Sequence, residues 1–504
     1  MSGTPSRAEV CALLAVAQAH AFAQPPDAML RGCLLGQWVA ERAGLSADDR
    51  AIAWWFGLLR YLGCTGHAHE IAVVWGDELE LRARSLVGDF SEPNEILREI
   101  VRNAGADKPG FARIRTVLAV LAGGRSFPES GFRTGCEVGD ELAVRLGIPT
   151  PAREALAFSF ERWGGKGFPN RAKGETIPLA VRVVHLAQEL EVLVRIEGPE
   201  EATRVIRKRS GRAYDPALVE VVAPIVAELC APLDEIDPWT EVLALAPESH
   251  PLSEAAFDDA LTVLADFSDL KSPYTASHSR KVAALVETAG GDADLRRAAL
   301  VHDLGRVAVP NSIWDKPAAL TRTERDRMET HAVVSDQLLR RVPALAAIAP
   351  VACSDHERVD GSGYHRRLTV RELGQPARLL AAADCYQTLL EARAHREPQT
   401  PADAATAVRE RAAAGTLDPA AVDAVLVAAG HMPTSARTAY PAGLTEREVE
   451  VLRLIARGLT TREAAAKLVI SAKTADRHVQ NLYGKVGVST RGAAALFAME
   501  QGLL

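Results

Sequence analysis

Aromatic residues, paired cysteines and long apolar runs are scarce in this sequence. Aromatics make up 5% of the 504 residues, whereas residues that favour helices, such as alanine, leucine, glutamate and arginine, are frequent. We therefore expect a mostly helical, all-α chain. Its length exceeds what a single hydrophobic core usually holds and suggests about two to four domains.

The seven cysteines are scattered and never form a Cys-x-x-Cys pair. Such spacing argues against a disulfide framework and against a zinc cage, and is typical of reduced thiols in a cytoplasm. The longest apolar runs, such as 51–59, fall short of the ~20 residues that span a bilayer, and the chain opens without a signal-peptide pattern. The sequence therefore predicts a soluble, cytoplasmic protein with no membrane partner.

Basic residues are not in excess, because 58 Lys and Arg stand against 65 Asp and Glu, for a formal net charge of −7. This balance argues against a protein that coats nucleic acid with its whole surface. A single basic docking face remains compatible with it.

Two proline-rich breaks, at 231–253 and 432–443, separate stretches with helical patterning and predict regions at about 1–240, 250–430 and 438–504. The first two regions read as diverged copies of one unit. SFERWGGKGF at 159–168 parallels DHERVDGSGY at 355–364, and TGCEVGDEL at 134–142 parallels THAVVSDQL at 330–338. The paired positions are 25 residues apart in both regions, from 135 to 160 and from 331 to 356, which favours a tandem duplication.

The last region has the pattern of a helix-turn-helix module. Thr445 and Glu448 have the spacing of a capping box, which predicts the start of a helix. Val449, Leu452 and Ile455 then recur at helical spacing and predict a buried stripe.

Two more helices should follow in this module. Gly458 is expected to end the first helix, Thr461 to cap a short second one at 464–468, and Ser471 to open a third. The candidate DNA-binding residues of the third helix are Ser471, Lys473, Thr474, Arg477, His478, Gln480, Asn481 and Lys485. Gln and Asn suit adenine edges, Arg suits guanine, and Lys and Ser suit phosphates. Charge agrees locally, with nine Lys and Arg against five Asp and Glu between 444 and 491.

This module closely resembles the LuxR-type helix-turn-helix family. The resemblance rests on Glu446, Gly458, Ala465, Ser471, Thr474, His478, Lys485 and Arg491. Thr461 and Ala475 depart from the Asn and Val that are commoner in that family. The resemblance implies a transcription regulator with double-stranded DNA as its partner, and such modules usually act as homodimers. A small helical dimerisation domain with a solvated polar face is the alternative.

The central region carries histidines and aspartates within otherwise apolar helices. They are His278, His302, Asp303, His331, Asp355, His356 and Asp384. An adjacent His-Asp pair at a helix end can give one ligand to each of two metals, and imidazoles with a bridging carboxylate suit iron, manganese or zinc. Two such metals could activate a water and stabilise the leaving oxygen of a phosphodiester. Any one of these histidines alone would be read as an ordinary core or surface residue.

The motifs HDLG at 302–305 and GSGY at 361–364 resemble the signatures of HD-GYP phosphohydrolases, a helical family that hydrolyses cyclic di-GMP. The resemblance covers about 250–430 and implies two divalent metal ions. The implied metal ligands are His278, His302, Asp303, His331, His356 and Asp384. It further implies catalytic roles for His302, Asp303 and Arg306, and substrate contacts from Gly363, Tyr364, Arg393 and Arg396. The planar guanidinium groups suit the substrate's phosphates.

The central region departs from that family at four positions. Arg306 stands where the family has Lys, which keeps the charge but not the shape. Asp355 replaces the first of two paired histidines and can still ligate a hard metal, and His365 replaces the signature Pro. Tyr274 stands where some members have a Glu for a third metal, so we expect at most two metals.

The first region has lost this constellation. Arg60-Tyr61, Gly135, Phe160 and Gln188 occupy the positions of His302-Asp303, His331, His356 and Asp384. Arginine and aromatic side chains cannot hold a metal cluster, so we expect a helical scaffold for packing or dimerisation. A sensor or ligand-binding role is the alternative, because a pocket that loses its metals can keep its shape.

We therefore interpret the chain as two tandem HD-GYP-like domains followed by a LuxR-type helix-turn-helix. The expected function is a transcription regulator with a metal-dependent phosphodiesterase domain, whose expected substrate is cyclic di-GMP. A receptor that binds a nucleotide without cleaving it is the rival hypothesis. A phosphohydrolase for another nucleotide also stays open, because the Gly-Tyr-Pro signature is incomplete.

Overall fold

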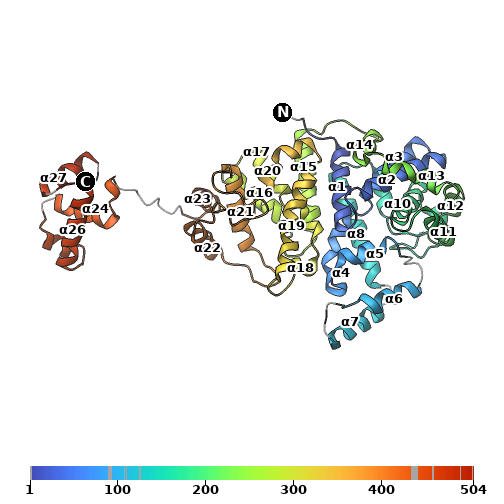
Figure 1. Cartoon of the computed structure of the whole chain (residues 1–504), viewed down its shortest axis with the longest axis horizontal. Coiled ribbons are helices and arrows are strands. Elements are labelled where there is room, and N and C mark those ends of the chain that lie inside the picture. The colour runs from blue at the N-terminus through green and yellow to red at the C-terminus, as the bar shows by residue number, and fades with distance from the viewer. Residues whose placement is uncertain are drawn as a thin grey trace. The chain divides into compact units, whose positions relative to one another are not determined.

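The computed structural model describes residues 3–88, 93–106, 108, 110–123, 126–432, 441–456, 459–488, 490–501 and 503. Helices make up all the regular structure of these residues, and the few β-contacts are isolated bridges, so the predicted all-α class is confirmed. The chain divides into two compact units, of which the first ends at Gly430 and the second begins at His431 (Figure 1).

The N-terminal half of the first unit begins with a helix whose capping box joins Ser6 and Glu9. Its helices, with 3-10 helices written η, are α1 (Arg7–Ala21), α2 (Ala28–Arg42), α3 (Ala47–Leu59), η1 (Leu62–His67), α4 (Ala68–Trp75), α5 (Glu78–Ser85), α6 (Pro93–Asn103), α7 (Gly110–Gly123), α8 (Ser126–Arg145), α9 (Thr150–Leu156), η2 (Gly174–Thr176), α10 (Leu179–Glu197), α11 (Pro199–Arg209), α12 (Pro216–Val222), α13 (Val226–Cys230), η3 (Ala231–Asp234) and α14 (Pro238–Ala244). Among the described residues, no single helix is long and apolar enough to span a membrane, although the bent pair α12 and α13–η3 meets the criteria of length and composition.

The second half of this unit has helices that begin at side-chain caps, such as Asp292, Thr321 and Asp418. Its helices are α15 (Glu254–Asp269), α16 (His278–Thr288), α17 (Ala293–Val301), η4 (Leu304–Ala308), α18 (Asn311–Trp314), α19 (Arg322–Leu339), α20 (Pro343–Ala352), α21 (Gln375–Leu390), α22 (Pro401–Ala413) and α23 (Pro419–Ala428). The buried side chains of both halves form one continuous hydrophobic core.

The same close contacts recur in both halves, as expected for a duplication. A Cβ on Gly63 would meet the carbonyl of Gly135, and a Cβ on Gly305 would meet the carbonyl of His331, so η1 against α8 repeats η4 against α19. Both pairs of segments approach too closely for any side chain. Between η1 and α8 the first copy carries α4–α7, whereas the second copy has only α18 at that place.

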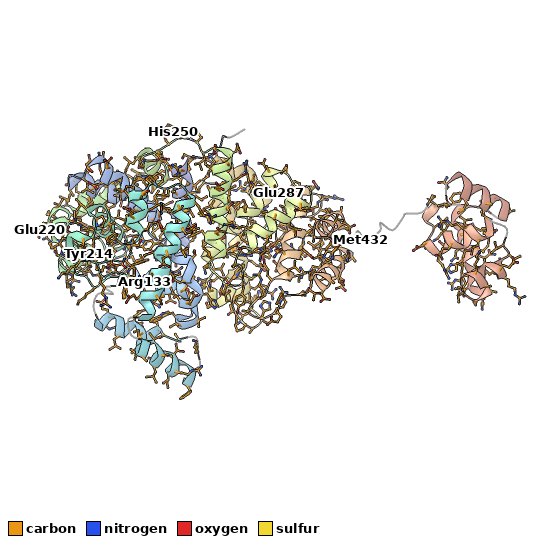
Figure 2. The ribbon with its side chains drawn as sticks, turned by 180° about the vertical axis from the view of Figure 1, so that it is seen from behind. Arg133, Tyr214, Glu220, His250, Glu287 and Met432 are labelled. Carbon is orange, nitrogen blue, oxygen red and sulfur yellow. The ribbon has the colours of Figure 1, made fainter. Side chains whose placement is uncertain are left out.

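The predicted break at 231–253 is packed onto the unit rather than free. It contains η3 and α14, and Trp54 Nε1 donates to the Val242 carbonyl at 3.0 Å. The segment around His250, at the edge of the unit in Figure 2, returns to the first helix, where the Leu252 amide donates to Pro5 at 2.9 Å. These contacts hold the connecting segment against the first predicted region, and the first two predicted regions lie within one compact unit with a shared hydrophobic core.

The second unit begins at His431, and Met432, labelled in Figure 2, is the last residue described before 441. It contains η5 (Pro441–Gly443), α24 (Glu446–Ala456), α25 (Thr461–Lys467), α26 (Ala472–Val486) and α27 (Arg491–Glu500). Val449, Leu452 and Ile455 are buried in its own core, as predicted.

The helix caps of the second unit agree with the sequence at two of three places. Thr445 and Glu448 exchange hydrogen bonds, and the Ser471 hydroxyl accepts the Thr474 amide at 3.1 Å. The predicted cap Thr461 is wrong, because Thr460 forms the capping box with Glu463 and Thr461 is the first helical residue. The predicted stop at Gly458 lies outside the described residues.

Candidate functional site

Two adjacent groups of buried side chains in the second copy could hold metal ions. One group contains Asp303, His331, Asp355 and His356, and the other contains His278, His302 and Asp384. The ligand atoms within each group lie within 4.8 Å of one another. Among the residues that the structure describes, the first copy contains no such group. The structure therefore brings all seven predicted metal ligands together.

The fold brings these residues together from the ends and faces of five helices. His278 is the first residue of α16. His302 is the C-cap of α17, and Asp303 is the next residue in the chain. His331 lies on α19, Asp384 lies on α21, and Asp355-His356 follow the end of α20. Helix ends allow two consecutive residues to face one site, which a straight helix does not.

Asp303 lies between the two groups. One carboxylate oxygen, Oδ1, is 3.6 Å from His331 Nε2, and the other, Oδ2, is 2.8 Å from His302 Nε2 and 3.6 Å from His278 Nε2. Burial disfavours its charge, but the neighbouring Arg306 and His302 hold the pKa of Asp303 well below its usual range. Asp303 is therefore held as a charged carboxylate between the two groups of candidate ligands.

Three histidine rings are oriented by an oxygen atom that lies within hydrogen-bond distance of Nδ1. Nδ1 of His302 lies 2.8 Å from the Ala299 carbonyl, and Nδ1 of His331 lies 2.6 Å from the Met328 carbonyl. Nδ1 of His278 lies 2.8 Å from a carboxylate oxygen of Glu391. Contacts of this kind fix the tautomer and direct Nε2 toward a metal.

The donor atoms fit a metal because several of them are buried without a hydrogen bond. In the described part of the chain these include His302 Nε2, His331 Nε2, Asp355 Oδ2 and both carboxylate oxygens of Asp303. Buried polar atoms without partners are costly and rare in folded proteins. A set of them that converges from separate helices is what divalent cations coordinate.

Asp355 stands where the resemblance places an imidazole. Its Oδ2 is 3.1 Å from His356 Nε2, so the carboxylate reaches the same group of ligands. Burial raises the pKa of Asp355 to about 8, which favours the neutral acid unless a cation is near. A bound cation would therefore favour the charged carboxylate at this position.

Arg306 is buried beside Asp303. Its Nη2 contacts Asp303 Oδ2, and its guanidinium lies 4.7 Å from the centre of the Trp314 ring. The nearest other carboxylate is Asp269, at 3.9 Å from Nη1. Arg306 therefore offsets the negative charge of the central carboxylate.

The predicted substrate residues differ in what they contact. The Tyr364 ring is tilted by 32° against the His356 ring, with the two ring centres 4.8 Å apart, at the edge of the metal groups. A Cβ on Gly363 would lie 2.5 Å from the Arg358 amide, so packing alone requires glycine there. Arg393 donates to the Tyr274 carbonyl at 2.7 Å and to Glu391 at 3.2 Å, whereas Arg396 donates to the Leu389 and Thr388 carbonyls. Roles for these four residues at a substrate stay predictions.

Glu391 was not foreseen from the sequence. Besides His278, it accepts from Gln387 Nε2 at 2.8 Å and pairs with Arg393, so it links a metal-ligand candidate to a predicted phosphate contact. Its signal in the sequence is weak, since a lone Glu after a helix has many explanations.

A buried ion pair connects the two copies beside this site. Lys271, in the loop that leads to His278, pairs with Glu78 at the start of α5 in the first copy, and both side chains are almost fully buried. Lys271 Nζ also donates to the Val309 carbonyl at 2.7 Å, and the Asn311 amide donates to Glu78 at 3.0 Å. We call these residues the inter-copy clasp. The first copy therefore supports the segments that carry His278 and Arg306.

In the first copy, the equivalent site is filled by its own side chains. Arg60 Nη1 donates to Gln188 Oε1 at 3.1 Å, and its Nε donates to the Ser159 carbonyl at 2.9 Å. Phe132 packs at 4.5 Å from Phe160, the counterpart of His356. The predicted loss of the metal constellation is thus accompanied by closure of the space it would need.

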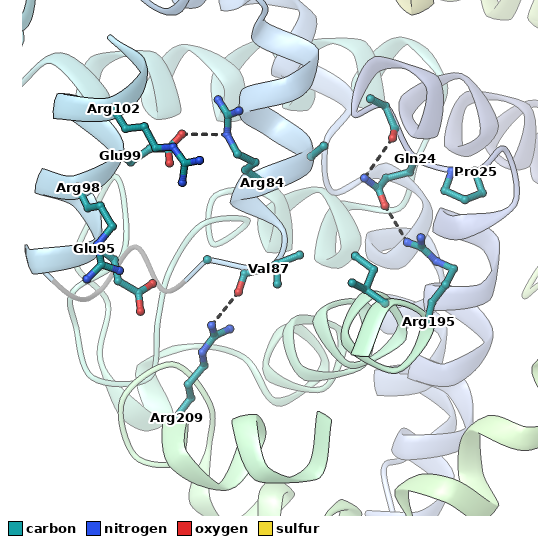
Figure 3. Close-up of a pocket in the computed structure, with 14 residues that line it drawn as sticks. Gln24, Pro25, Arg84, Val87, Glu95, Arg98, Glu99, Arg102, Arg195 and Arg209 are labelled. Carbon is teal, nitrogen blue, oxygen red and sulfur yellow. Dashed lines mark hydrogen bonds and ion pairs between the residues drawn. The ribbon is translucent and has the colours of Figure 1, made fainter. Parts of the chain in front are cut away.

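A separate open hollow of about 710 Å³ lies in the first copy (Figure 3). Arginines from four helices line it: Arg84, Arg98, Arg102, Arg195 and Arg209. Three of these are held within the protein, Arg84 by Glu99, Arg195 by Gln24 and Arg209 by the Val87 carbonyl. A sensor role for the first copy stays a prediction.

In the second unit, α26 presents the predicted DNA-binding side chains. Ser471, Lys473, Thr474, Arg477, Gln480, Asn481 and Lys485 are exposed, and His478 is half-buried. Lys485 differs from the others, because its Nζ pairs with the buried Glu448 at 2.7 Å and donates to the Gly443 carbonyl at 3.0 Å. It therefore ties α26 to α24 within the module, and its predicted contact with DNA remains untested.

Two protein-family models match this chain. The HD domain model matches residues 141–218 and 262–421, in both copies, and the model of bacterial regulatory proteins of the luxR family matches 442–498. The chain is 32% identical over 424 residues to 3'3'-cGAMP-specific phosphodiesterase 3 of Vibrio cholerae serotype O1, covering 81% of this chain and 92% of that protein. The chain belongs to the HD-domain cyclic dinucleotide phosphodiesterases. The HD-GYP and LuxR-type resemblances are thereby confirmed.

A solved structure and a second relative in sequence also resemble this HD-domain phosphodiesterase. The crystal structure of a cyclic GMP-AMP specific phosphodiesterase of V. cholerae superposes with a TM-score of 0.57 at 28% identity, covering 86% of this chain and 99% of that one. The cyclic di-GMP phosphodiesterase response regulator RpfG of Xanthomonas campestris pv. campestris is 37% identical over 136 residues, which is 26% of this chain and 35% of that protein. The former likeness extends over both copies, whereas the latter is confined to a shorter stretch.

Proposed function

We propose that this protein is a DNA-binding regulator whose second HD copy hydrolyses a cyclic dinucleotide with two bound divalent metal ions, iron, manganese or zinc. The observation that carries the proposal is the convergence of buried Nε2 and carboxylate atoms without hydrogen bonds around Asp303. When bound, two metals would activate a water and stabilise charge on a phosphodiester oxygen.

The protein's own residues prepare this site. Glu391 and the carbonyls of Ala299 and Met328 hold three imidazoles with Nε2 inward. Arg306 offsets the charge of Asp303, and Arg393 keeps further N–H donors beyond its bonds to Tyr274 and Glu391. Those donors would position a substrate phosphate beside the metal groups.

The choice of substrate is open between two cyclic dinucleotides. 3'3'-cGAMP is favoured because the relative that matches across 92% of its own length is specific for it, whereas RpfG, named for cyclic di-GMP, matches over a shorter stretch. We therefore expect the higher kcat/KM with 3'3'-cGAMP. The sequence-based expectation of cyclic di-GMP becomes the competing outcome.

The test follows products from both cyclic dinucleotides by chromatography, using full-length protein reconstituted with Fe, Mn or Zn. The His302→Ala/Asp303→Ala variant is the negative control. Linear dinucleotide from the wild type alone supports the enzyme. No product from either substrate by metal-loaded protein would leave a receptor that controls DNA binding as the better account.

For DNA binding, we propose that α26 reads a major groove and that the protein acts as a homodimer on two half-sites. Lys473→Ala should weaken binding to all sequences and lower the salt slope by about 1, whereas Asn481→Ala should relax the choice at one base pair by about 1–3 kcal/mol. Duplexes selected by the wild type from a random pool, titrated at several salt concentrations, separate the two effects. Equal losses on all sequences for both variants would contradict base reading by Asn481.

A further inference from the structure

The α6–α7 insertion of the first copy carries an unusual apolar surface. On α7, four large apolar side chains remain exposed: Phe111 at 82%, Leu118 at 60%, Ile114 at 57% and Leu121 at 41%. In Figure 1, α6 and α7 lie at the edge of their unit, away from the helices that enclose its core. None of the described residues of α6 or α7 belongs to the hydrophobic core.

These side chains form one face of α7. Positions 111, 114, 118 and 121 follow the alternating three- and four-residue steps of a heptad seam, in which residues a and d line one side of a helix. The other side of α7 is fixed to its own unit, where Arg113 donates to the Arg102 carbonyl at 2.9 Å and Thr116 accepts from Lys108 at 3.4 Å. We call Phe111, Ile114, Leu118 and Leu121 the α7 stripe.

Large apolar side chains scattered singly over a surface need no explanation, but a contiguous stripe usually marks an interface. A heptad seam is self-complementary, because a second identical helix offers matching knobs and holes. Among the positions of α7 whose exposure is described, Arg115 is the only exposed charged residue, so these positions form no acidic or basic face that competes with apolar pairing. A second copy of this chain is the occupant that fits these features.

We infer that the α7 stripe pairs with the α7 stripe of a second chain and is the dimer interface of the first unit. The inference rests on the proposed homodimer and names its surface. Because each chain has one LuxR-type module, pairing of the first units would bring two modules within reach of neighbouring half-sites. Such tethering raises the affinity for a double site by about 10²–10⁴-fold without any new DNA contact. The copy that lost its metal site would thus determine how two chains pair.

The experiment measures the molar mass of full-length protein by light scattering coupled to size exclusion. Wild type should have twice the mass of one chain, and the Ile114→Glu/Leu118→Glu variant should have the mass of one chain. Leu245→Glu is the matched control, because Leu245 is 45% exposed elsewhere in the same unit, and this variant should remain a dimer. Circular dichroism checks the fold of each variant.

A second measurement uses duplexes that the wild type selects from a random pool. Affinity for a double site should fall by about 10²-fold or more in the stripe variant, with hydrolysis per chain unchanged. A monomeric wild type, or a stripe variant that stays dimeric, would overturn the inference. A dimeric wild type that selects no DNA would instead defeat the proposed DNA function and leave the α7 stripe standing.

Discussion

The two copies keep one fold but differ in what fills the same space. In the second copy, imidazole and carboxylate atoms converge around Asp303 and are left without hydrogen bonds. In the first copy, Arg60 donates hydrogen bonds to Gln188 and to the Ser159 carbonyl, and Phe160 packs on Phe132. A site for a cation is thus recognised by converging ligand atoms that lack hydrogen bonds, at some cost to stability. In the first copy, the counterparts Arg60 and Gln188 bond to each other instead.

Matched substitutions in the two copies should affect hydrolysis very differently. His302→Ala/Asp303→Ala should abolish hydrolysis, because it removes the bridging carboxylate and one imidazole. The matched change Arg60→Ala should leave kcat unchanged and lower stability by about 1–3 kcal/mol, since buried partners lose their hydrogen bonds. Turnover and urea unfolding of both variants give the comparison. Loss of turnover in Arg60→Ala would contradict the conclusion that only the second copy carries out hydrolysis.

A second substitution breaks the inter-copy clasp. Glu78→Ala leaves Lys271 buried without its carboxylate and should cost about 3–5 kcal/mol in the free energy of unfolding. Glu80→Ala, at an exposed position of the same helix, should have no measurable effect. Equal unfolding midpoints for the two variants would show that the clasp does not join the copies.

A smaller effect is expected from Glu391→Gln. The change keeps the size of the side chain but weakens the partner that orients His278, so metal affinity or turnover should fall by about 10–100-fold. The exposed Glu372 provides the control Glu372→Gln, for which both quantities should stay at the wild-type value. Metal titrations followed by assays of hydrolysis give both readings. Unchanged metal affinity and turnover in Glu391→Gln would mean that His278 needs no such partner.

The smallest effect concerns the DNA-binding module. Thr460→Ala should destabilise α25 by about 0.5–2 kcal/mol because it removes the N-cap, whereas Thr461→Ala should change little. Hydrogen exchange at the amides of 461–467 in the full-length protein measures both. The reverse order would restore Thr461 as the cap.

The metal-ligand candidates were found from the sequence because short motifs such as HDLG at 302–305 carry a family resemblance, and that resemblance implies the remaining ligands. It missed Glu391, Glu78 and Lys271, whose roles depend on packing between segments far apart in the chain. The sequence could have shown that Thr460 is the N-cap, because Glu463 lies three residues after Thr460, which is the spacing of a capping box, and only two residues after Thr461. The contacts of Lys485 with Glu448 and Gly443 needed the three-dimensional arrangement of α24 and α26.

On the proposed function, the second copy binds two metals and the first copy binds none. Metal content per chain, measured by mass spectrometry on reconstituted and desalted protein, tests it directly. We expect two ions in wild type and in Arg60→Ala, and a large loss in His302→Ala/Asp303→Ala. Two ions retained in the His302→Ala/Asp303→Ala variant, or lost in Arg60→Ala, would contradict the account.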